Sequence, residues 1–472
     1  MPQNTAVDRT RKHGSEPSDG PTRRAVLVGG VAIGLTAALA GGPLWGARSA
    51  RAATPRTFYV DPKGGDDAAA GTPSWRSWAS TARANAALAA GEIGTGDTLL
   101  LRRGRRHFGV LRPGAVGGLT IGSWGDEPES PEVTAYKYVQ SEACWVRVGD
   151  DLWAVDIRGA AHGRTHHGHV SAWSTEVGFI KVDGTIHGDR KGSVSSLHAA
   201  WQFVSSGATV TVRNPENPSR GGRRVWLAVA EPILEGRSGV VVTDLVLRGT
   251  GRNAVQTSSA VPTRGFELRD CTVGEAGGGF ASDGVSRFGN GVQVWSGAED
   301  VLVQSTTITD CWDTATTIQG PVQLGDVGWR NVVFEGNDLD RNMQGFEYWS
   351  TGARSGAPGT ACTFRGNRSS AAGSSWSRTI RPDRAGKGSH LLFYGDSAVI
   401  EVRIEGNTFS GASDSYLYAN RAIPERLRSD RNVIELTQET RLQWQTADRI
   451  GDAAAWSERT GLERSSTFRT IA

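Results

Sequence analysis

The sequence predicts an all-β solenoid, in which short strands stack coil upon coil around one core. Two observations support this prediction. Five segments share one strand-and-bend pattern at intervals of about one coil, and a second apolar strand follows each of them. With 62 glycines for turns and 16 tryptophans for the core, the 472-residue chain has the composition of a large folded β domain.

The repeat runs from residue 266 to residue 409. In each segment apolar and polar residues alternate up to a bend, and the segments are 266–273, 301–308, 332–339, 362–369 and 402–409. Their sixth positions are Cys271, Thr306, Asn337, Asn367 and Asn407, which lie 35, 31, 30 and 40 residues apart. Such spacing is too long for hairpins and suits one coil with variable loops. A β-sandwich would show similar alternation but no fixed long period.

The asparagines at the bends have a structural explanation. An amide side chain can donate and accept hydrogen bonds at once, so stacked asparagines can link each coil to the next. We therefore predict an interior ladder of Asn337, Asn367 and Asn407. The second strands are expected at 291–295, 315–319, 345–349, 390–394 and 416–420.

The regions before and after the repeat differ from it in sequence pattern. Residues 53–135 hold a strand, a glycine-rich turn, a helical stretch at 80–90 and another strand, so we assign them to an N-terminal cap and first coils. Residues 136–235 contain strand-like pieces without the repeat and are interpreted as a β-rich insertion. The main coils are expected at 236–440. A polar tail, 441–472, is expected to pack across the last coil or to fray.

The N-terminus has the features of an export signal. Arg23 and Arg24 precede an apolar run at 31–40, and Ala50-Arg51-Ala52 is a small-x-small cleavage site. Residues 1–52 are therefore interpreted as a twin-arginine signal, with a Sec-type signal as the alternative. Either signal predicts a secreted, extracellular protein without a membrane span, because the apolar run is shorter than the ~20 residues a spanning helix needs.

Charge and cysteines narrow the choice of partners. Residues 53–472 hold 45 basic and 46 acidic residues, so no overall field attracts nucleic acid or a polyanion, and a monomer is expected. Cys144, Cys271, Cys311 and Cys362 lack CxxC spacing. Buried free thiols are expected, with one disulfide as the alternative.

Several motifs are similar to those of a known family. The "YVD…GGDD…GT" opening at 59–72 and "GDTLLLRRG" at 96–104 resemble the cap of secreted right-handed parallel β-helix proteins. The stretches at 287–295, 313–320 and 345–349 resemble the "RYGNG…W", "DAG…Q" and "EYW" signatures of pectate-lyase-like proteins. The resemblance implies a right-handed parallel β-helix that belongs to a group containing polysaccharide lyases and glycoside hydrolases. It assigns no catalytic residue.

The second strands should present two outward rows of side chains. Alternation places Gln293, Thr317, Glu347 and Leu392 in one row and Trp295, Gln319, Trp349 and Tyr394 in the other. Aromatic rings stack on the apolar faces of sugars, and polar groups bind their hydroxyls. Substrate binding is therefore predicted at Trp295, Gln293, Gln319, Trp349 and Tyr394.

Two carboxylates in this region could act as acid and base. Asp313 starts one second strand and Glu347 lies within the next, and neighbouring coils are about 4.8 Å apart. Carboxylates at that spacing suit a glycoside hydrolase. Asp310 lies at the bend before the strand of Asp313, and for both residues a role in the turn is the alternative, since aspartate is common in turns.

A basic loop points to a different chemistry. Residues 376–390 include Arg384, Lys387 and His390, and they lead directly into a second strand. A β-eliminating lyase needs cations that neutralise a uronate carboxylate and a base that removes the neighbouring proton. We therefore add His390, Lys387 and Arg287 to the catalytic candidates and Arg384 to the substrate-binding candidates. A solvated loop is the alternative.

A metal is not indicated. His162, His166, His167 and His169 lie in a glycine-containing loop without a nearby carboxylate motif, and no EF-hand loop is present; Ca²⁺ bound by separate coils would be invisible in sequence. The sequence favours a polysaccharide lyase acting on a uronate-containing polymer. The alternatives are a glycoside hydrolase with paired carboxylates and a non-catalytic carbohydrate-binding or adhesion β-helix.

Overall fold

The computed structural model describes residues 54–139, 141–158, 176–280, 284, 286–321, 328–351, 359–381, 388–395, 401–420 and 422–472. Residues 54–472 form one compact unit, and the export signal assigned to residues 1–52 lies outside the described residues. In the described part, no helix is long and apolar enough to cross a membrane.

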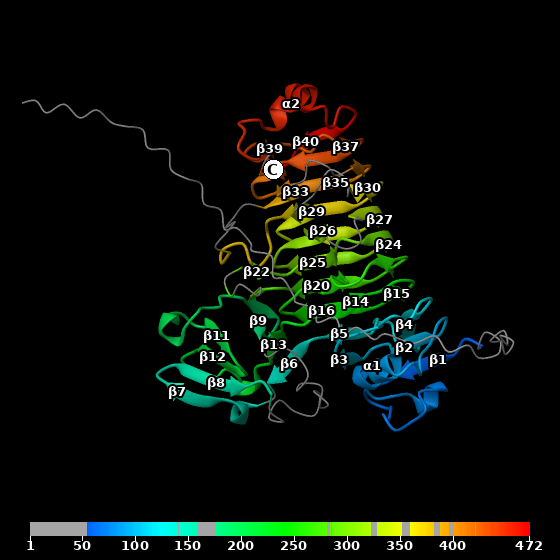
Figure 1. Ribbon diagram of the computed structural model, residues 1–472. Coiled ribbons are helices and arrows are strands. Elements are labelled where there is room, and N and C mark those ends of the chain that lie inside the picture. The colour runs from blue at the N-terminus through cyan, green and yellow to red at the C-terminus, as the bar shows by residue number, and fades with distance from the viewer. Residues whose placement is uncertain are drawn as a thin grey trace, which may run out of the picture. The chain divides into compact units, whose positions relative to one another are not determined.

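The coils of the unit stack into three parallel sheets, and a complete coil contributes one strand to each of them (Figure 1). One central coil consists of β24 (Ala298–Gln304), β25 (Thr307–Cys311) and β26 (Thr314–Pro321), and the next of β27 (Trp329–Glu335), β28 (Asp338–Asp340) and β29 (Gln344–Thr351). We call the sheet that contains β24 sheet A, that of β25 sheet B and that of β26 sheet C. The predicted right-handed parallel β-helix is confirmed.

The coils that follow repeat this arrangement. They comprise β31 (Cys362–Arg365), β32 (Arg368–Ala372) and β33 (Ser389–Gly395), then β34 (Val402–Glu405), β35 (Thr408–Ala412) and β36 (Ser415–Ala419). A last coil comprises β37 (Leu427–Asp430), β38 (Val433–Leu436) and β39 (Arg441–Gln443). The short strand β30 (Gly359–Thr360) pairs with β27.

The coils before them start at the N-terminal cap. Sheet A contains β1 (Thr57–Val60), β2 (Thr98–Arg102), β4 (Thr120–Trp124), β15 (Val241–Thr243) and β19 (Glu267–Arg269), with β18 (Thr263–Arg264) beside β24. Sheet B contains β3 (Arg106–Phe108), β5 (Glu132–Thr134), β16 (Val246–Thr250) and β20 (Thr272–Ala276). Sheet C contains β14 (Leu234–Gly236), β17 (Val255–Thr257) and β23 (Val292–Val294). Helix α1 (Thr81–Ala89) belongs to the cap.

The predicted asparagine ladder is present at the bend between sheets A and B. The Asn367 Oδ1 atom accepts hydrogen bonds from the Asn337 backbone N–H and side-chain amide, both at 2.9 Å. The Asn407 Oδ1 atom accepts the same pair from Asn367, and Asn432 continues the ladder by one coil. The preceding Gly336 and Gly366 have φ angles of 63° and 62°, a left-handed conformation that glycine adopts without steric cost. The Gly-Asn pair thus makes the bend.

The C-terminal tail binds the last residue of the asparagine ladder. The last ladder residue, Asn432, donates its backbone N–H to Ser466 Oγ at 2.9 Å and its amide to Glu463 Oε2 at 2.9 Å. The tail forms β39, helix α2 (Ala453–Thr460) and β40 (Thr467–Thr470), which pairs with β38. Residues 441–472 therefore close the last coil rather than fray.

The insertion interrupts one coil between β5 of sheet B and β14 of sheet C. Its strands form two antiparallel sheets, one of β6 (Tyr136–Val139), β9 (Val177–Val182), β10 (Thr185–His187) and β13 (Val225–Val229), the other of β7 (Val146–Gly149), β8 (Leu152–Asp156), β11 (Phe203–Ser206) and β12 (Thr209–Arg213). The side chains between them make a hydrophobic core separate from that of the coils.

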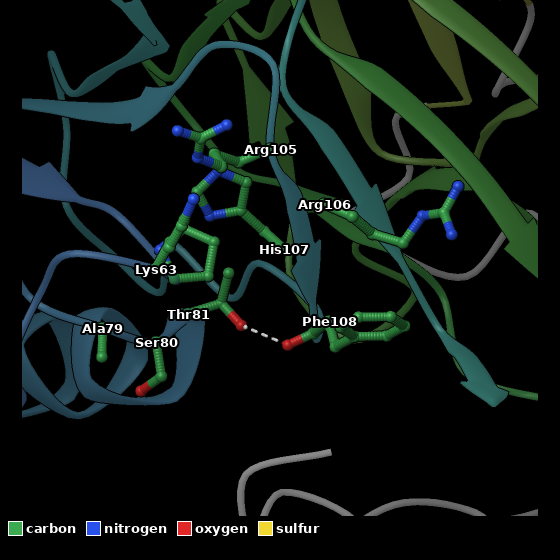
Figure 2. A pocket seen from close by; sticks show the side chains of 9 residues that line it. Lys63, Ala79, Ser80, Thr81, Arg105, Arg106, His107 and Phe108 are labelled. Carbon is green, nitrogen blue, oxygen red and sulfur yellow. Dashed lines mark hydrogen bonds between the residues drawn. The ribbon is translucent and has the colours of Figure 1, made fainter. Parts of the chain in front are cut away.

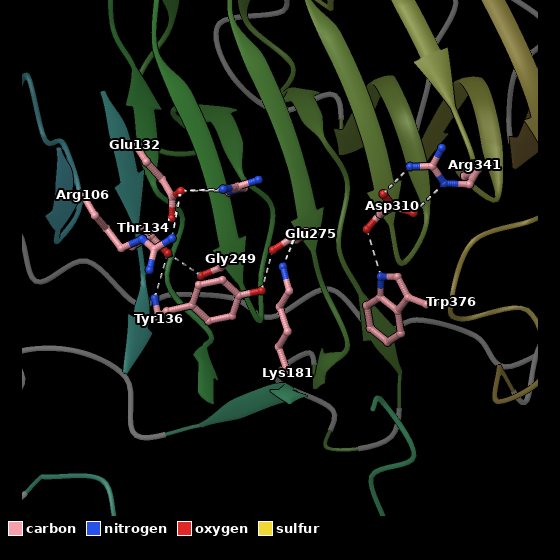
Figure 3. Close-up of polar contacts among 11 residues, drawn as sticks. Arg106, Glu132, Thr134, Tyr136, Lys181, Gly249, Glu275, Asp310, Arg341 and Trp376 are labelled. Atoms are coloured by element: carbon pink, nitrogen blue, oxygen red, sulfur yellow. Dashed lines mark hydrogen bonds and ion pairs between the residues drawn. The ribbon is translucent and has the colours of Figure 1, made fainter. Parts of the chain in front are cut away.

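Polar contacts join the insertion to the coils. The Glu275 carboxylate accepts from Tyr136 Oη at 2.7 Å and from Lys181 Nζ at 2.5 Å (Figure 3). Glycines permit close approach nearby, since a Cβ atom on Gly178 would lie 2.3 Å from the Gly277 carbonyl oxygen. The insertion is therefore fixed beside the corner where sheet B turns into sheet C.

Candidate functional site

The outward face of sheet C has the two predicted rows. Gln293 pairs in register with Thr317, Thr317 with Glu347, and Glu347 with Leu392. In the second row Gln319 pairs with Trp349, and Trp349 with Tyr394. Trp295 follows directly after β23 and joins this row, since its ring lies within 2.7 Å of where a Cβ atom on Gly320 would be. The second row is half-buried, and the first row is buried.

Of the four paired residues in the first row, Glu347 alone carries a carboxylate. Its residue is 5% exposed, and its Oε2 atom accepts a hydrogen bond from Thr314 Oγ1 at 3.1 Å. Thr314 begins β26 on the neighbouring coil, directly after Asp313. The threonine thus ties Glu347 to the coil that carries Asp313, and the two carboxylates lie on adjacent coils as predicted.

Asp313 forms a shielded ion pair. Its Oδ1 atom lies 2.9 Å from Arg381 Nη1, and the Arg381 side chain is 1% exposed against 14% for that of Asp313. The same Arg381 atom donates to the Trp312 carbonyl oxygen at 2.8 Å. Arg381 places a fixed positive charge beside the candidate acid and base. Because the ion pair is shielded from water, its charges interact more strongly than exposed charges would.

The segment before Arg381 is held over the corner between sheets B and C by hydrogen bonds to backbone carbonyl groups. Ser375 Oγ donates to the Cys311 carbonyl at 2.6 Å, and Ser377 Oγ donates to the Trp312 carbonyl at 2.7 Å. The Trp376 indole N–H donates to the Asp310 carbonyl at 2.9 Å (Figure 3). Sequence reasoning saw this loop as basic and missed the serines, which alternate at 375 and 377 and fix the position of the arginine.

Asp310 has a turn role instead. Its φ angle is 55°, a left-handed conformation that aspartate tolerates, and its carboxylate binds the Arg341 guanidinium, with Oδ2 2.8 Å from Nη2 (Figure 3). Figure 3 shows this pair beside Trp376. Asp310 is therefore occupied at the end of β25.

The structure corrects the prediction for His390. The residue is fully buried, its Nδ1 atom lies 2.9 Å from Ser369 Oγ, and its ring packs against Phe409. Burial lowers the pKa of His390 to about 3, so the imidazole is neutral at physiological pH. His390 was predicted to be catalytic because it ends the basic loop beside sheet C, but in the structure its ring lies on the inner side of the strand, where the printed register of β29 and β33 leaves out Gly345 and His390. His390 is thus a core residue and cannot contact a polysaccharide.

Arg287 is also a structural residue rather than a catalytic one. Its guanidinium donates to the carbonyl oxygens of Gly278, Gly178 and Gly188 at 2.7, 3.1 and 2.9 Å, and it lies 3.9 Å from the centroid of the Trp312 ring. Burial lowers its pKa to about 9, which still leaves it cationic at neutral pH. Its hydrogen bonds join the insertion to the coils, so the guanidinium is committed.

Gln293 belongs to a buried amide network. Its Oε1 atom accepts from Asn253 Nδ2 at 2.7 Å and from Asn290 Nδ2 at 3.0 Å, and the residue is 3% exposed. This placement makes it a support for the face of sheet C rather than a sugar contact. The remaining candidates Lys387 and Arg384, and the histidines at 162–169, lie outside the described residues.

The aromatic face extends beyond the predicted residues. Tyr418 follows Leu392 in register, and its ring stacks on Trp444 at a centroid distance of 4.2 Å and an interplanar angle of 26°. Trp444 was not predicted, because the tail has no recognisable repeat. Its only sequence signal is the short alternation in 441–444.

Metal ligands do not gather in the described part of the chain, where no group of three or more His, Cys, Asp or Glu side chains could hold an ion. The four cysteines are free thiols, and burial raises the pKa of Cys271 and Cys362 to about 12, so these thiols are unreactive.

The coils, the ladder and the outward rows define a right-handed parallel β-helix with a polar and aromatic face on sheet C. No protein-family model and no curated protein matches the chain. Solved structures do: XylC in complex with xylose has a TM-score of 0.54 and 12% identity over 82% of this chain and 67% of that one.

Two further structures are more distant. GH136 lacto-N-biosidase from Eubacterium ramulus has 11% identity and a TM-score of 0.43, covering 88% of this chain and 68% of that one. Pectate lyase Pel9A has 10% identity and a TM-score of 0.38, covering 89% and 79%. At these identities the likeness is one of fold.

Proposed function

We propose that the protein is an exported, polysaccharide-degrading enzyme, and that it hydrolyses glycosidic bonds with Asp313 and Glu347 as its acid and base. The observation that carries the proposal is that the two carboxylates lie on adjacent coils, with Glu347 bound by Thr314 Oγ1 and the preceding residue, Asp313, bound by the buried Arg381. The twin-arginine motif before residue 53 supports action outside the cytoplasm.

The geometry fits a sugar chain that lies across the outward face of sheet C. Trp295, Trp349 and Tyr394 are half-buried on this face, and aromatic rings of this kind stack on the apolar faces of sugars. The row of Gln293, Thr317 and Glu347 lies alongside them. A glycosidic bond held on the aromatic row would therefore sit near Glu347.

Hydrolysis needs one carboxyl group that protonates the leaving oxygen and one that acts as base or nucleophile. Arg381 holds Asp313 in place and supplies positive charge at the corner, while Thr314 orients the Glu347 carboxylate. In this proposal Arg381 is a positioning residue, since its guanidinium is committed to Asp313 and to a backbone carbonyl.

Two of the residues assigned to the lyase hypothesis have structural roles instead. His390 is inside the core and Arg287 is committed to backbone carbonyls, so the described residues do not bring a base and a free cation together at sheet C. A neutral polysaccharide therefore suits the described face better than a polyuronate.

Product analysis tests the proposal. The protein is incubated separately with neutral and uronate-containing polysaccharides, and reducing ends are measured together with the ultraviolet absorbance of unsaturated uronates. Reducing ends without that absorbance are expected, and they should be lost in Asp313→Asn and Glu347→Gln. Absorbance that survives in both variants would instead establish elimination at another site. No cleavage of any polymer, with oligosaccharide binding retained, would favour the adhesion function.

The anomeric form of the first product sharpens the assignment. Retention of configuration is expected if the carboxyl groups act about 5 to 5.5 Å apart, and inversion if they act about 6.5 to 9.5 Å apart. Proton NMR of the fresh product distinguishes the two.

A further inference from the structure

A cavity of about 200 Å³ lies in the N-terminal cap, apart from the face of sheet C. Strand β3 forms one wall, and the start of helix α1 with the loop at Pro62 and Lys63 forms the other (Figure 2). A hydrogen bond of 3.2 Å from Thr81 Oγ1 to the Phe108 carbonyl oxygen holds the two walls together. Since β3 begins sheet B, the cavity opens at the first coil.

His107 contributes an unsatisfied acceptor to this cavity. The residue is 2% exposed, and its Nε2 atom lies 3.2 Å from the Arg102 carbonyl oxygen, so Nε2 carries the proton and donates it. The Nδ1 atom is then an acceptor, and it is buried without a hydrogen-bond partner. Burial lowers the pKa of His107 to about 4, so the ring stays neutral at physiological pH. Leaving such an acceptor unsatisfied costs free energy that a donating ligand would recover.

The opposite side of the cavity is cationic. Among the described residues, the Lys63 ammonium group forms no ion pair. Arg105 has only loose acidic neighbours, since its Nε atom lies 4.0 Å from Asp61 Oδ1 and its Nη2 atom 3.8 Å from Glu127 Oε1. The Arg105 Nε–H is buried and has no hydrogen-bond partner. Two cations therefore have donors to spare at this cavity.

The other charged groups nearby are committed. Arg106 is bound to the Glu132 carboxylate, with Nε 2.6 Å from Oε1. The start of helix α1 already has an anion, because Asp67 Oδ1 accepts from the backbone N–H groups of Ala79 and Ser80 at 2.9 Å. The helix end is therefore no part of the site, and the lining that remains is one neutral acceptor and two cationic donors.

We propose that this cavity binds a small hydroxylated carboxylate, such as a single uronate sugar unit. Its carboxylate faces Lys63 and Arg105, and one of its hydroxyls donates to His107 Nδ1. The cavity volume of about 200 Å³ suits a compact ligand rather than a polymer. The site is a second one, independent of the proposed chemistry at Glu347.

Titration calorimetry of the protein with sodium glucuronate, glucose and inorganic phosphate tests the assignment. Saturable binding of glucuronate is expected, with at least tenfold weaker binding of glucose, which lacks the carboxylate. Equal affinity for glucose would overturn the cationic role of Lys63 and Arg105. Phosphate that competes as strongly as glucuronate would overturn the assignment to a hydroxylated carboxylate.

Variants locate the site. Lys63→Met keeps the side-chain stem and removes the charge at an exposed position, and it is expected to weaken glucuronate binding about tenfold. His107→Gln keeps an amide N–H near the position of Nε2 but has no acceptor at the position of Nδ1, and a similar weakening of binding is expected. Lys191→Met is the matched control, because that ammonium group is paired with Asp189 in the insertion at 2.8 Å. If His107→Gln does not fold, Lys63→Met alone decides, and unchanged binding in it overturns the proposal.

Discussion

Two columns of side chains run along the coils, one inside and one outside. The inner column, at the bend between sheets A and B, repeats Asn337, Asn367, Asn407 and Asn432, and each residue bonds to the next in the same way. The outer column on sheet C is equally regular in register but changes from coil to coil, through Gln293, Thr317, Glu347, Leu392 and Tyr418.

The difference separates structure from chemistry. A position that repeats one residue type solves the same backbone problem in every coil, so its repetition indicates a structural role. A position that keeps its register but varies its chemistry is not required for the stack, and a carboxylate there needs another explanation. Changes in the inner column should therefore alter stability, and changes in the outer column should alter activity.

The largest expected effect is on the outer column. Glu347→Gln should lower turnover about a hundredfold or more, the scale of lost acid/base catalysis, and leave the unfolding temperature within a few degrees of the parent. Turnover and thermal unfolding are measured on the same preparations. The control is Glu405→Gln, an acid paired with the exposed Arg431, which should keep full activity.

Asn367→Leu addresses the inner column. It strands the backbone N–H of Asn337 and the carbonyl of Phe334, which the Asn367 side chain now satisfies, so we expect a loss of about 1 to 3 kcal/mol in the free energy of unfolding. Urea unfolding measures the loss. Activity per folded molecule should not change. A variant with parental stability would contradict the ladder's structural role.

His390 tests whether an inward residue acts through stability alone. Its pKa is about 3 in the folded protein and about 6.5 when unfolded, so the unfolded state binds more protons between these values and stability falls as the pH drops from 6.5. The parent should lose roughly 1 to 2 kcal/mol more between pH 7 and pH 5 than His390→Leu, as measured by urea unfolding. Equal pH dependence in both proteins would place His390 outside the core.

The smallest effect is expected at the aromatic row. Trp349→Ala should weaken oligosaccharide binding by about 0.5 to 1.5 kcal/mol, the scale of one stacking contact, with little change in turnover at saturating substrate. KM and kcat are compared for long and short oligosaccharides. A large fall in kcat with unchanged KM would show that Trp349 positions the reacting bond and not merely the chain.

Much of the fold was predictable because the coils repeat. Alternation gave the inward and outward rows correctly through the paired parts of β23, β26, β29 and β33, and the asparagine positions predicted the ladder. Asn432 and Trp444 were missed because the last coil shortens the pattern and its flanking residues are polar. The prediction failed at His390, where the composition of the basic loop suggested a groove residue but the side chain packs inside against Ser369 and Phe409.

The candidate site was only half predictable. Register placed Asp313 and Glu347 on neighbouring coils, since that depends on local pairing. The partner of Asp313 comes from 68 residues away, and the loop that carries Arg381 is fixed by serine contacts with carbonyl oxygens. Such contacts depend on how a loop folds over a corner, and no sequence period records them. Arg287 was misassigned for the same reason, since two of its three carbonyl partners, Gly178 and Gly188, belong to the insertion.

The closure of the ladder at Asn432 bears on how the protein behaves at high concentration. A stack of parallel strands has two open ends, each with unpaired backbone groups that could continue into a neighbouring molecule. At the C-terminal end the donors of the last rung are taken by Ser466 and Glu463, and β40 covers β38. The tail therefore leaves no donor of the last ladder residue open at this end, which disfavours continuation of the asparagine ladder into a neighbouring molecule.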